Sequence, residues 1–252
     1  MGKFVQKQNF GVEKYEAIIK NSFKKVLALG QVLKFYKFQF AGSLTSSETF
    51  YDTAGHILEK AGIILSRIQE RDRVFFKVEQ SAYLKKTFKH TTSKIFTHKV
   101  GAKDSIKDHA FYLVDGIRGL YSTSFSVDLE NVIKNAVPTI TISTKADVYK
   151  VISGTGFRCY MAHEEIVYKN FETKKKYQSQ GMTIKHLGPE QYLDEFNEFN
   201  KAVQKHCKEF LVVHDNTFEH AKNVTKKIEV PKLTKEEKKK QKELEKKKNA
   251  IK

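Results

Sequence analysis

Cysteine and proline are scarce in this sequence of 252 residues, which has two cysteines and three prolines. Two thiols cannot form the dense disulfide framework of a small secreted scaffold, so that class of protein is excluded. No apolar run approaches the roughly 18 residues that a membrane-spanning helix needs. The first residues also lack the apolar stretch of a secretory signal. We therefore expect a cytoplasmic protein without a transmembrane segment.

Arginine is scarce as well. The basic residues are 41 lysines and 5 arginines against 29 acidic residues, which gives a net charge of +17. Proteins that read a base sequence rely on arginine forks, so this lysine-dominated chain favours non-specific attraction to phosphate-rich partners. Residues 222–252 hold 13 Lys and 5 Glu, a Lys/Glu-rich tail that leaves +9 on residues 1–221. The tail is either a solubilising segment or a polyanion-binding arm.

Hydrophobic residues make up 40% of the chain and aromatic residues 12%, which is enough to bury a core. Runs rich in β-formers dominate the middle and follow one another as hairpins. The predicted strands are 3–10, 32–40, 48–53, 63–70, 73–80, 139–144, 146–152, 157–162, 164–170 and 177–186. The predicted helical segments are 13–29, 54–61, 127–136, 192–211 and 216–221, with parts of 81–125, and the predicted loops include 42–47 and 154–156. This order predicts an α+β fold over residues 1–221, an antiparallel sheet or barrel with helices packed outside.

Four groups of residues carry a family resemblance through their order and spacing. They are Phe50-Tyr51-Asp52-Thr53 with Leu58 and Ala61-Gly62-Ile63; Pro138 to Lys145 with Val148-Tyr149; Glu164 to Tyr168 with the Glu172-Thr173 turn and the helix after Tyr192; and His214-Asp215 with Glu219 to Ala221. Together they resemble the CYTH family, the triphosphate tunnel metalloenzymes. The resemblance covers about residues 3–222.

The resemblance implies a closed antiparallel β-barrel, a tunnel lined by Lys, Arg and Glu with helices outside. Alternate residues of each strand would point into the lumen of such a barrel. Members of the family typically hydrolyse triphosphates or polyphosphates, or cyclise ATP, with Mg²⁺ or Mn²⁺. Inward cations would hold the phosphates, and inward carboxylates would hold the metal through oxygen ligands.

The sequence departs from the family at its hallmark, a Glu-x-Glu-x-Lys strand near the N-terminus. The matching residues are Val5-Gln6-Lys7-Gln8-Asn9, which include no carboxylate. Glu164 and Glu79 are the remaining candidate metal ligands, whereas a hard cation needs several anionic oxygens. We therefore predict a pseudoenzyme that needs no cofactor. The alternative is an active triphosphatase, polyphosphatase or adenylate cyclase, which would require Mg²⁺ or Mn²⁺.

Basic residues on the central strands are the predicted phosphate-binding groups. They are Lys77, Lys145, Arg158 and Lys185, with Arg67 and Arg73 as further candidates. They would hold phosphate oxygens by charge, and the partner would be a nucleotide or other phosphorylated small molecule, polyphosphate or RNA. A third interpretation is an inert interaction scaffold.

Other residue groups favour structural roles. Residues 35–38 interleave aromatic and basic side chains as single-strand binders do, but alternate aromatics in a strand mostly pack in a core. The nine histidines are scattered and lack the tight pairs of a zinc site. Cys159 and Cys207 are predicted to pack as small apolar side chains.

Overall fold

The computed structural model describes residues 2–7, 12–17, 22–80, 93–121, 127–208, 210–212 and 217–226. The strands are β1 (Gly2–Lys7), β2 (Val12–Ala17), β3 (Tyr36–Asp52), β4 (Ile63–Glu70), β5 (Arg73–Gln80), β6 (Ser93–Val100), β7 (Val137–Ser153), β8 (Arg158–Asn170), β9 (Lys176–His186) and β10 (Leu211–Val212). The helices are α1 (Ser22–Val32), α2 (Ile57–Lys60), α3 (Ala110–Leu120), α4 (Leu129–Lys134), α5 (Leu193–His206) and α6 (Thr217–Val224). Within these residues, no helix has the length and hydropathy to cross a membrane.

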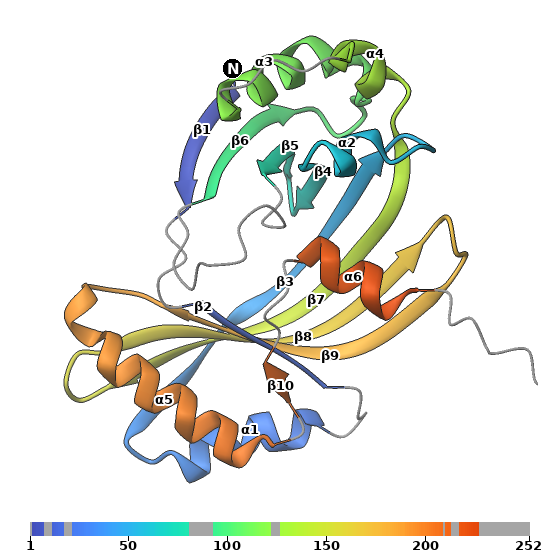
Figure 1. Cartoon of the computed structure of the whole chain (residues 1–252). Helices are drawn as coiled ribbons and strands as arrows, with labels where there is room; N and C mark the ends of the chain where they lie inside the picture. The colour runs from blue at the N-terminus through green and yellow to red at the C-terminus, as the bar shows by residue number, and fades with distance from the viewer. Residues whose placement is uncertain are drawn as a thin grey trace, which may run out of the picture.

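The ten strands form one sheet in the order β1-β6-β5-β4-β3-β7-β8-β9-β2-β10. Every neighbouring pair is antiparallel. β3 and β7 are 17 residues long, and they pair with each other along almost their whole length. Figure 1 shows that these two strands run through both halves of the molecule, from α2 and α4 down to α1 and α5. The predicted α+β class with an antiparallel sheet is confirmed.

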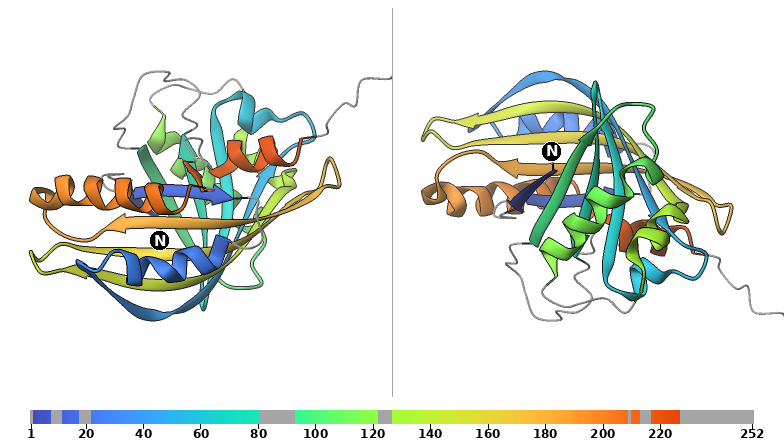
Figure 2. Two further views of the ribbon diagram at one scale, coloured as in Figure 1. Left: turned by 90° about the horizontal axis from the view of Figure 1, so that it is seen from below. Right: turned by 90° about the horizontal axis from the view of Figure 1, so that it is seen from above.

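The predicted closure into a barrel is not seen in the hydrogen bonding of the described strands. β1 pairs with β6 and β10 pairs with β2, and no ladder between described residues joins these two ends. Sheets of many strands twist, and Figure 2 shows the β4–β6 half turned across the β7–β9 half. The described strands therefore form one strongly twisted sheet with two distinct faces.

We call the face of the sheet that packs on α1, α3, α4 and α5 the outer face, and the opposite face, which packs on α6, the inner face. The outer face carries two apolar clusters. One joins β2, β7, β8 and β9 to α1 and α5, and Phe157, Phe196 and Phe199 are its largest fully buried side chains. The other joins β4, β5 and β6 to α3 and α4 around Phe76 and Leu113. Figure 1 shows α3 and α4 above the sheet and α1 and α5 below it. These four helices match the predicted outside position.

The inner face carries a third cluster, in which α6 packs on the centre of the sheet. Phe50, Ile140 and Tyr168, from three neighbouring strands, are grouped with Phe218 and Ala221 of α6. The ring centroids of Phe50 and Phe218 are 5.0 Å apart. The outside position predicted for the helices therefore does not hold for α6. The expected boundary between residues 221 and 222 also falls inside this helix.

Several predicted elements agree with the structure. The hairpin 63–70/73–80 is β4–β5 to the residue, and the predicted strands 164–170 and 177–186 pair as β8 and β9. The segments 139–144 and 146–152 are one strand, β7. The predicted loop 42–47 is wrong, because β3 continues through it. Ala41 forms a bulge there, and Gly42 has a φ of 122°, a backbone conformation that glycine adopts readily. The glycine therefore serves a bulge within a strand and not a loop.

The predicted helix 13–29 is only partly correct. Residues 12–17 form β2, which pairs with β9 and β10, and the helix α1 begins at Ser22. Tyr15 is 2% exposed in the outer cluster, so its apolar character serves a strand and not a helix. Contacts with strands distant in sequence override a local pattern here. The segment 81–125, expected to be helical in parts, contains β6 and α3, while residues 81–92 and 122–126 lie outside the described part.

The contact between α3 and β6 gives a test of the packing. A Cβ on Gly116 would lie 2.2 Å from Cδ1 of Phe96, a ring that is 3% exposed and has little room to move. Gly116→Ala should therefore lower the free energy of unfolding by about 1–3 kcal/mol, although alanine is the better helix former. Gly119→Ala, at an exposed position of α3, should be neutral or stabilising by up to about 1 kcal/mol. Urea denaturation of both variants measures the difference, and equal effects would contradict the close packing.

Candidate functional site

Four polar side chains meet on the inner face, where β3, β4 and β5 are neighbours. Lys77 Nζ lies 2.7 Å from Glu48 Oε1 and 3.3 Å from Glu79 Oε2. Ser66 Oγ donates a hydrogen bond to Glu48 Oε1 at 2.7 Å. The side chains of Lys77 and Glu48 are only 15% and 17% exposed. We call these residues the lysine–glutamate cluster.

The charge of Lys77 is held by its two partners. Burial acts to lower the pKa of Lys77, but the carboxylates of Glu48 and Glu79 act in the opposite direction, and the pKa of Lys77 is raised overall. Lys77 is therefore an ammonium ion at neutral pH. It contacts both carboxylates and partly neutralises them. A divalent metal at this position would have to displace the ammonium group, so these residues do not fit the metal site that the family resemblance implies.

Glu164, the other predicted metal ligand, lies apart from this cluster. It is on β8, in register with Gly181 of β9. The carboxylate of Glu164 lies over this glycine, because a Cβ added to Gly181 would be 2.9 Å from Glu164 Oε2. In the strand order, β4, β3 and β7 separate β8 from β5, which carries Glu79. Among the described residues, neither Glu79 nor Glu164 belongs to a group of three side chains close enough together to hold a metal ion.

A second polar region occupies the end of the inner face opposite to α2. Lys37 of β3 is in register with Ile152, and Ile152 with Arg158 of β8. In the next row, Lys150 of β7 is in register with Tyr160, and Tyr160 with Lys185 of β9. Side chains of one register row share a face of the sheet. Four cations from four neighbouring strands therefore lie in two adjacent rows on the same face as Tyr160. We call Lys37, Lys150, Arg158 and Lys185 the inner basic patch.

The inner basic patch has no counter-charge within the described part of the chain. None of its four cations makes an ion pair with a described residue, unlike Lys77. Lys37, Arg158 and Lys185 are exposed, and Lys150 is half-buried. On the inner face of β3, β7, β8 and β9, the acidic residue that follows this patch along the strands is Glu164 of β8. It lies four residues from Tyr160, or about 13 Å along β8. A positive field over this area is the consequence.

The structure separates the predicted phosphate-binding residues. Arg158 and Lys185 lie together in the inner basic patch, and Lys77 is in the lysine–glutamate cluster. Lys145 is exposed. It lies on the outer face, because it is an odd number of residues from Lys150 and the register of β7 with β8 is continuous between them. Arg67 is also on the outer face, where its Nη2 donates to the carbonyl of Ala102 at 2.6 Å. Arg73 is at the start of β5, where its exposed side chain pairs with Glu70 at 3.3 Å.

Sequence reasoning missed two members of the inner basic patch, Lys37 and Lys150. Their strands were recognised, but the face of each strand was not assigned. Alternation of side chains along β7 could have identified Lys150. Ile140 and Ile142 pack on α6 at the inner face, and Lys150, an even number of residues from both, lies on the same face. Lys37 then follows from its register with Ile152.

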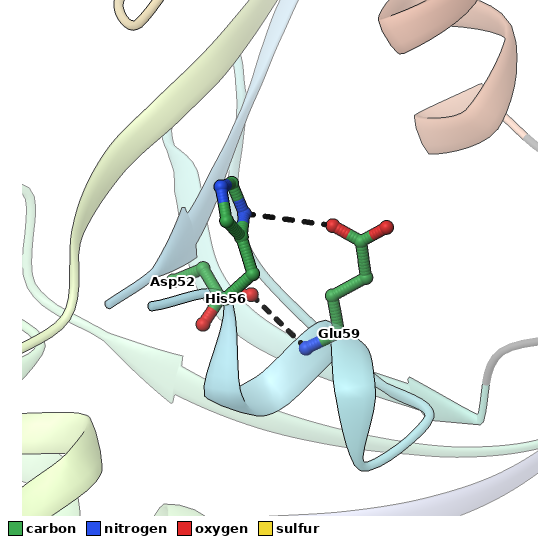
Figure 3. Close-up of side chains that lie close together, drawn as sticks. All are labelled: Asp52, His56 and Glu59. Atoms are coloured by element: carbon green, nitrogen blue, oxygen red, sulfur yellow. Dashed lines mark hydrogen bonds and ion pairs between the residues drawn. The ribbon is translucent and has the colours of Figure 1, made fainter. Parts of the chain in front are cut away.

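A third group of titratable side chains lies at the entrance to α2. Figure 3 shows His56 and Glu59 side by side, with the Asp52 carboxylate beneath them at the helix backbone. His56 Nδ1 is 3.6 Å from Glu59 Oε2, and the three residues have ligand atoms within 4.8 Å of one another. However, Asp52 is 3% exposed, and its two oxygens already accept hydrogen bonds from the backbone N–H groups of Thr53, Leu58 and Glu59. Asp52 therefore caps a short helix and is poorly available to a cation.

The same group borders a cavity of about 150 Å³ between α2, the β8–β9 turn and α6. Lys222 of α6 pairs with Glu59, and His56 Nε2 lies 3.6 Å from Glu172 Oε1 in the turn. Each acidic group on this side of the cavity thus has a cationic or histidine neighbour. These contacts join α6 to the sheet at its α2 end, which is a structural role.

Two histidines that are distant in sequence also meet. His98 Nε2 is 3.0 Å from His109 Nδ1, and His109 Nε2 is 3.1 Å from Asp104 Oδ2. Burial, followed by the neighbouring His109, lowers the pKa of His98. Two histidines alone do not make a zinc site, which takes three or four ligands. The pair connects β6 to the start of α3.

Comparisons with known proteins bear on the fold. No protein-family model and no curated protein matches the sequence. A candidate adenylyl cyclase from Hippeastrum, described as having a dominant triphosphatase activity, is 10% identical, with a TM-score of 0.50 over 84% of this chain and 95% of that chain. A candidate adenylate cyclase from Bacillus halodurans is 13% identical over 83% of this chain and 98% of that chain, with a TM-score of 0.46. The Hippeastrum likeness supports, at the level of the fold alone, the predicted resemblance to CYTH tunnel proteins.

The lysine–glutamate cluster predicts how metal affinity depends on Lys77. Lys77→Gln removes the ammonium and leaves two facing carboxylates, so the free energy of unfolding should fall by about 2–4 kcal/mol. Millimolar Mn²⁺ should restore about 1–3 kcal/mol to this variant by binding between Glu48 and Glu79, and it should leave the wild type unchanged. Lys77→Arg keeps a cation and is the matched control. Thermal unfolding with and without Mn²⁺ measures all three proteins, and equal stabilisation of the wild type would show that the cluster already accepts a metal.

The capping role of Asp52 gives a second prediction. Asp52→Ala leaves three backbone N–H groups without their acceptor, so the free energy of unfolding should fall by about 2–4 kcal/mol. Asp72→Ala, in the exposed β4–β5 turn, should change it by less than about 0.5 kcal/mol. Mn²⁺ or a chelator should not alter the wild-type melting temperature. A melting temperature that falls on chelation would instead assign Asp52, His56 and Glu59 to a metal.

Proposed function

We propose that this chain is a tunnel-fold protein that has lost the family's metal-dependent reaction and binds a phosphate-rich anion on the inner face of its sheet. The inner basic patch carries this proposal. Its cations lie on β3, β7, β8 and β9 without a described counter-ion, and such groups attract phosphate through charge. Closure of the sheet into a tunnel around the anion, and a cytoplasmic location, belong to the same proposal.

The loss of catalysis rests on the lysine–glutamate cluster. Metal-assisted phosphoryl transfer needs a divalent ion that neutralises the charge developing on the phosphate oxygens. Here Lys77 lies between the two carboxylates that share its part of the inner face. In the strand order, Glu164 on β8 is separated from Glu48 on β3 by one strand and from Glu79 on β5 by three. A fixed ammonium provides charge, but it does not activate water or bridge phosphate oxygens as a metal does.

An active phosphohydrolase is the second candidate, because Glu48, Glu79 and Glu164 still place three carboxylates on the inner face. The description of the Hippeastrum protein as a triphosphatase is consistent with a triphosphate as ligand or substrate for either candidate. Release of phosphate from tripolyphosphate in Mn²⁺, if Glu48→Gln abolishes it, would establish this second candidate and overturn the loss of catalysis.

Charge reversals on the two faces of the sheet, two on the inner face and one on the outer face, test which face binds the anion. Lys150→Glu together with Arg158→Glu should weaken binding of fluorescently labelled polyphosphate at least about tenfold at low salt, because two attractive contacts become repulsive. Lys145→Glu, on the same strand but on the outer face, should change the affinity by less than about twofold. The measurement is fluorescence anisotropy at two salt concentrations, repeated after deletion of residues 227–252 to separate the contribution of the tail.

The control decides between the remaining interpretations. An equal loss from Lys145→Glu would mean that the net charge, and not the inner face, attracts the anion. A full-length protein that does not bind polyphosphate at low salt would leave the inert scaffold as the explanation.

A further inference from the structure

Tyr160 holds an unusual position within the inner basic patch. It lies on the inner face of β8 and is 39% exposed, with Lys150 and Lys185 directly opposite it on β7 and β9. Other tyrosines of the sheet, such as Tyr168 and Tyr15, are buried in apolar clusters. No described aromatic ring pairs with Tyr160, in contrast to Tyr168, which packs with Tyr177. Its side chain is therefore partly open to solvent and has a lysine opposite it on each neighbouring strand.

The spacing of the cations describes the shape of the ligand. Lys37, Lys150, Arg158 and Lys185 lie on four adjacent strands, which span about 14 Å across the sheet. A compact triphosphate would need cations that point to one small volume. Cations spread over two rows are better placed to contact successive phosphates of a chain that runs across the strands.

We propose that the anion is a single-stranded nucleic acid, with a base stacked on Tyr160 and the flanking phosphates held by the inner basic patch. This inference rests on the proposed function and narrows its ligand. Single-strand binders combine a positive groove along the backbone with aromatic side chains that stack on bases, and this stacking tolerates any sequence. Polyphosphate has no base to stack, and a duplex hides its base faces. Tyr160 therefore distinguishes single strands from both.

The patch also indicates a lack of base specificity. Three of its four cations are lysines, which bind phosphate as point charges and do not form the bidentate contacts with which arginine reads guanine. Arg158 is the one arginine of the patch, and it lies in the row beside Tyr160. Binding should therefore depend strongly on salt and weakly on sequence.

The test uses the full chain and a labelled single-stranded RNA or DNA of about 12 nucleotides, within the range that such grooves cover. Tyr160→Ala should weaken binding of the single strand at least about fivefold, which is the lower end of the effect of one stacked base. The same variant should bind polyphosphate within about twofold of the wild type. Tyr160→Phe keeps the ring and should keep the affinity for the single strand.

Phe40→Ala provides the matched control. Phe40 is 62% exposed on the outer face, beside Tyr149, so its loss removes an exposed ring from the opposite side of the sheet. It should not change the binding of the single strand. Circular dichroism and thermal unfolding confirm that each variant is folded before its affinity is compared.

The outcomes separate the two proposals. Polyphosphate binding that depends on Lys150 and Arg158, with no effect of Tyr160→Ala on the single strand, would overturn the nucleic-acid inference and leave the proposed function intact. Duplex binding as tight as single-strand binding, or an equal loss of polyphosphate binding in Tyr160→Ala, would also overturn it. Binding of neither anion would overturn both.

Discussion

Side-chain alternation along two very long strands is the constraint on which the arrangement of this molecule depends. β3 and β7 pair over 16 positions that include a bulge at Ala41, and each strand passes from one half of the sheet to the other. Away from the bulge, each step of one residue along a strand changes the face of the sheet on which the side chain lies. Along β7, Tyr149 and Val151 lie in the cluster of α1 and α5, while Ile140 and Ile142 pack with α6 and Lys150 shares their face. Along β3, the bulge at Ala41 exchanges the faces, so that Phe38 lies in the cluster of α1 and α5 and Phe50 in that of α6. A single pairing register thus fixes the core and the candidate site together.

The two polar regions of the inner face differ in how their charge is used. In the lysine–glutamate cluster, the ammonium of Lys77 partly neutralises two carboxylates, and the carboxylates that bind Lys77 also fix its position. In the inner basic patch, the cations have no described acidic partner and remain exposed to solvent. Desolvating an unpaired charge is costly, so such groups stay at the surface unless a ligand of opposite charge covers them. The first region therefore stabilises the sheet, and the second is available for binding.

The sequence predicted the parts of this arrangement that depend on local pattern. The hairpin of β4 and β5, the β8–β9 pair and the helix α5 all have clear alternation or helical spacing, and the structure has them. The sequence could not show that residues 12–17 add a strand beside β9, because that pairing joins segments about 170 residues apart. Nor could it place Glu48 beside Lys77, because that contact depends on register across strands. The opposite faces of Lys145 and Lys150 were missed because 139–144 and 146–152 were predicted as two strands and not as the single strand β7. Arg158 and Lys185 lie on the predicted strands 157–162 and 177–186, which are parts of β8 and β9.

An ammonium group that belongs to the chain behaves differently from a bound ion. Lys77 cannot be extracted by a chelator, replaced by a competing metal or depleted when the cell is short of magnesium. Lys77 carries its charge before and after folding, and pairing with Glu48 and Glu79 places that charge at one point when β3 and β5 come together. The cation between these two carboxylates is therefore part of the covalent sequence and needs no bound metal.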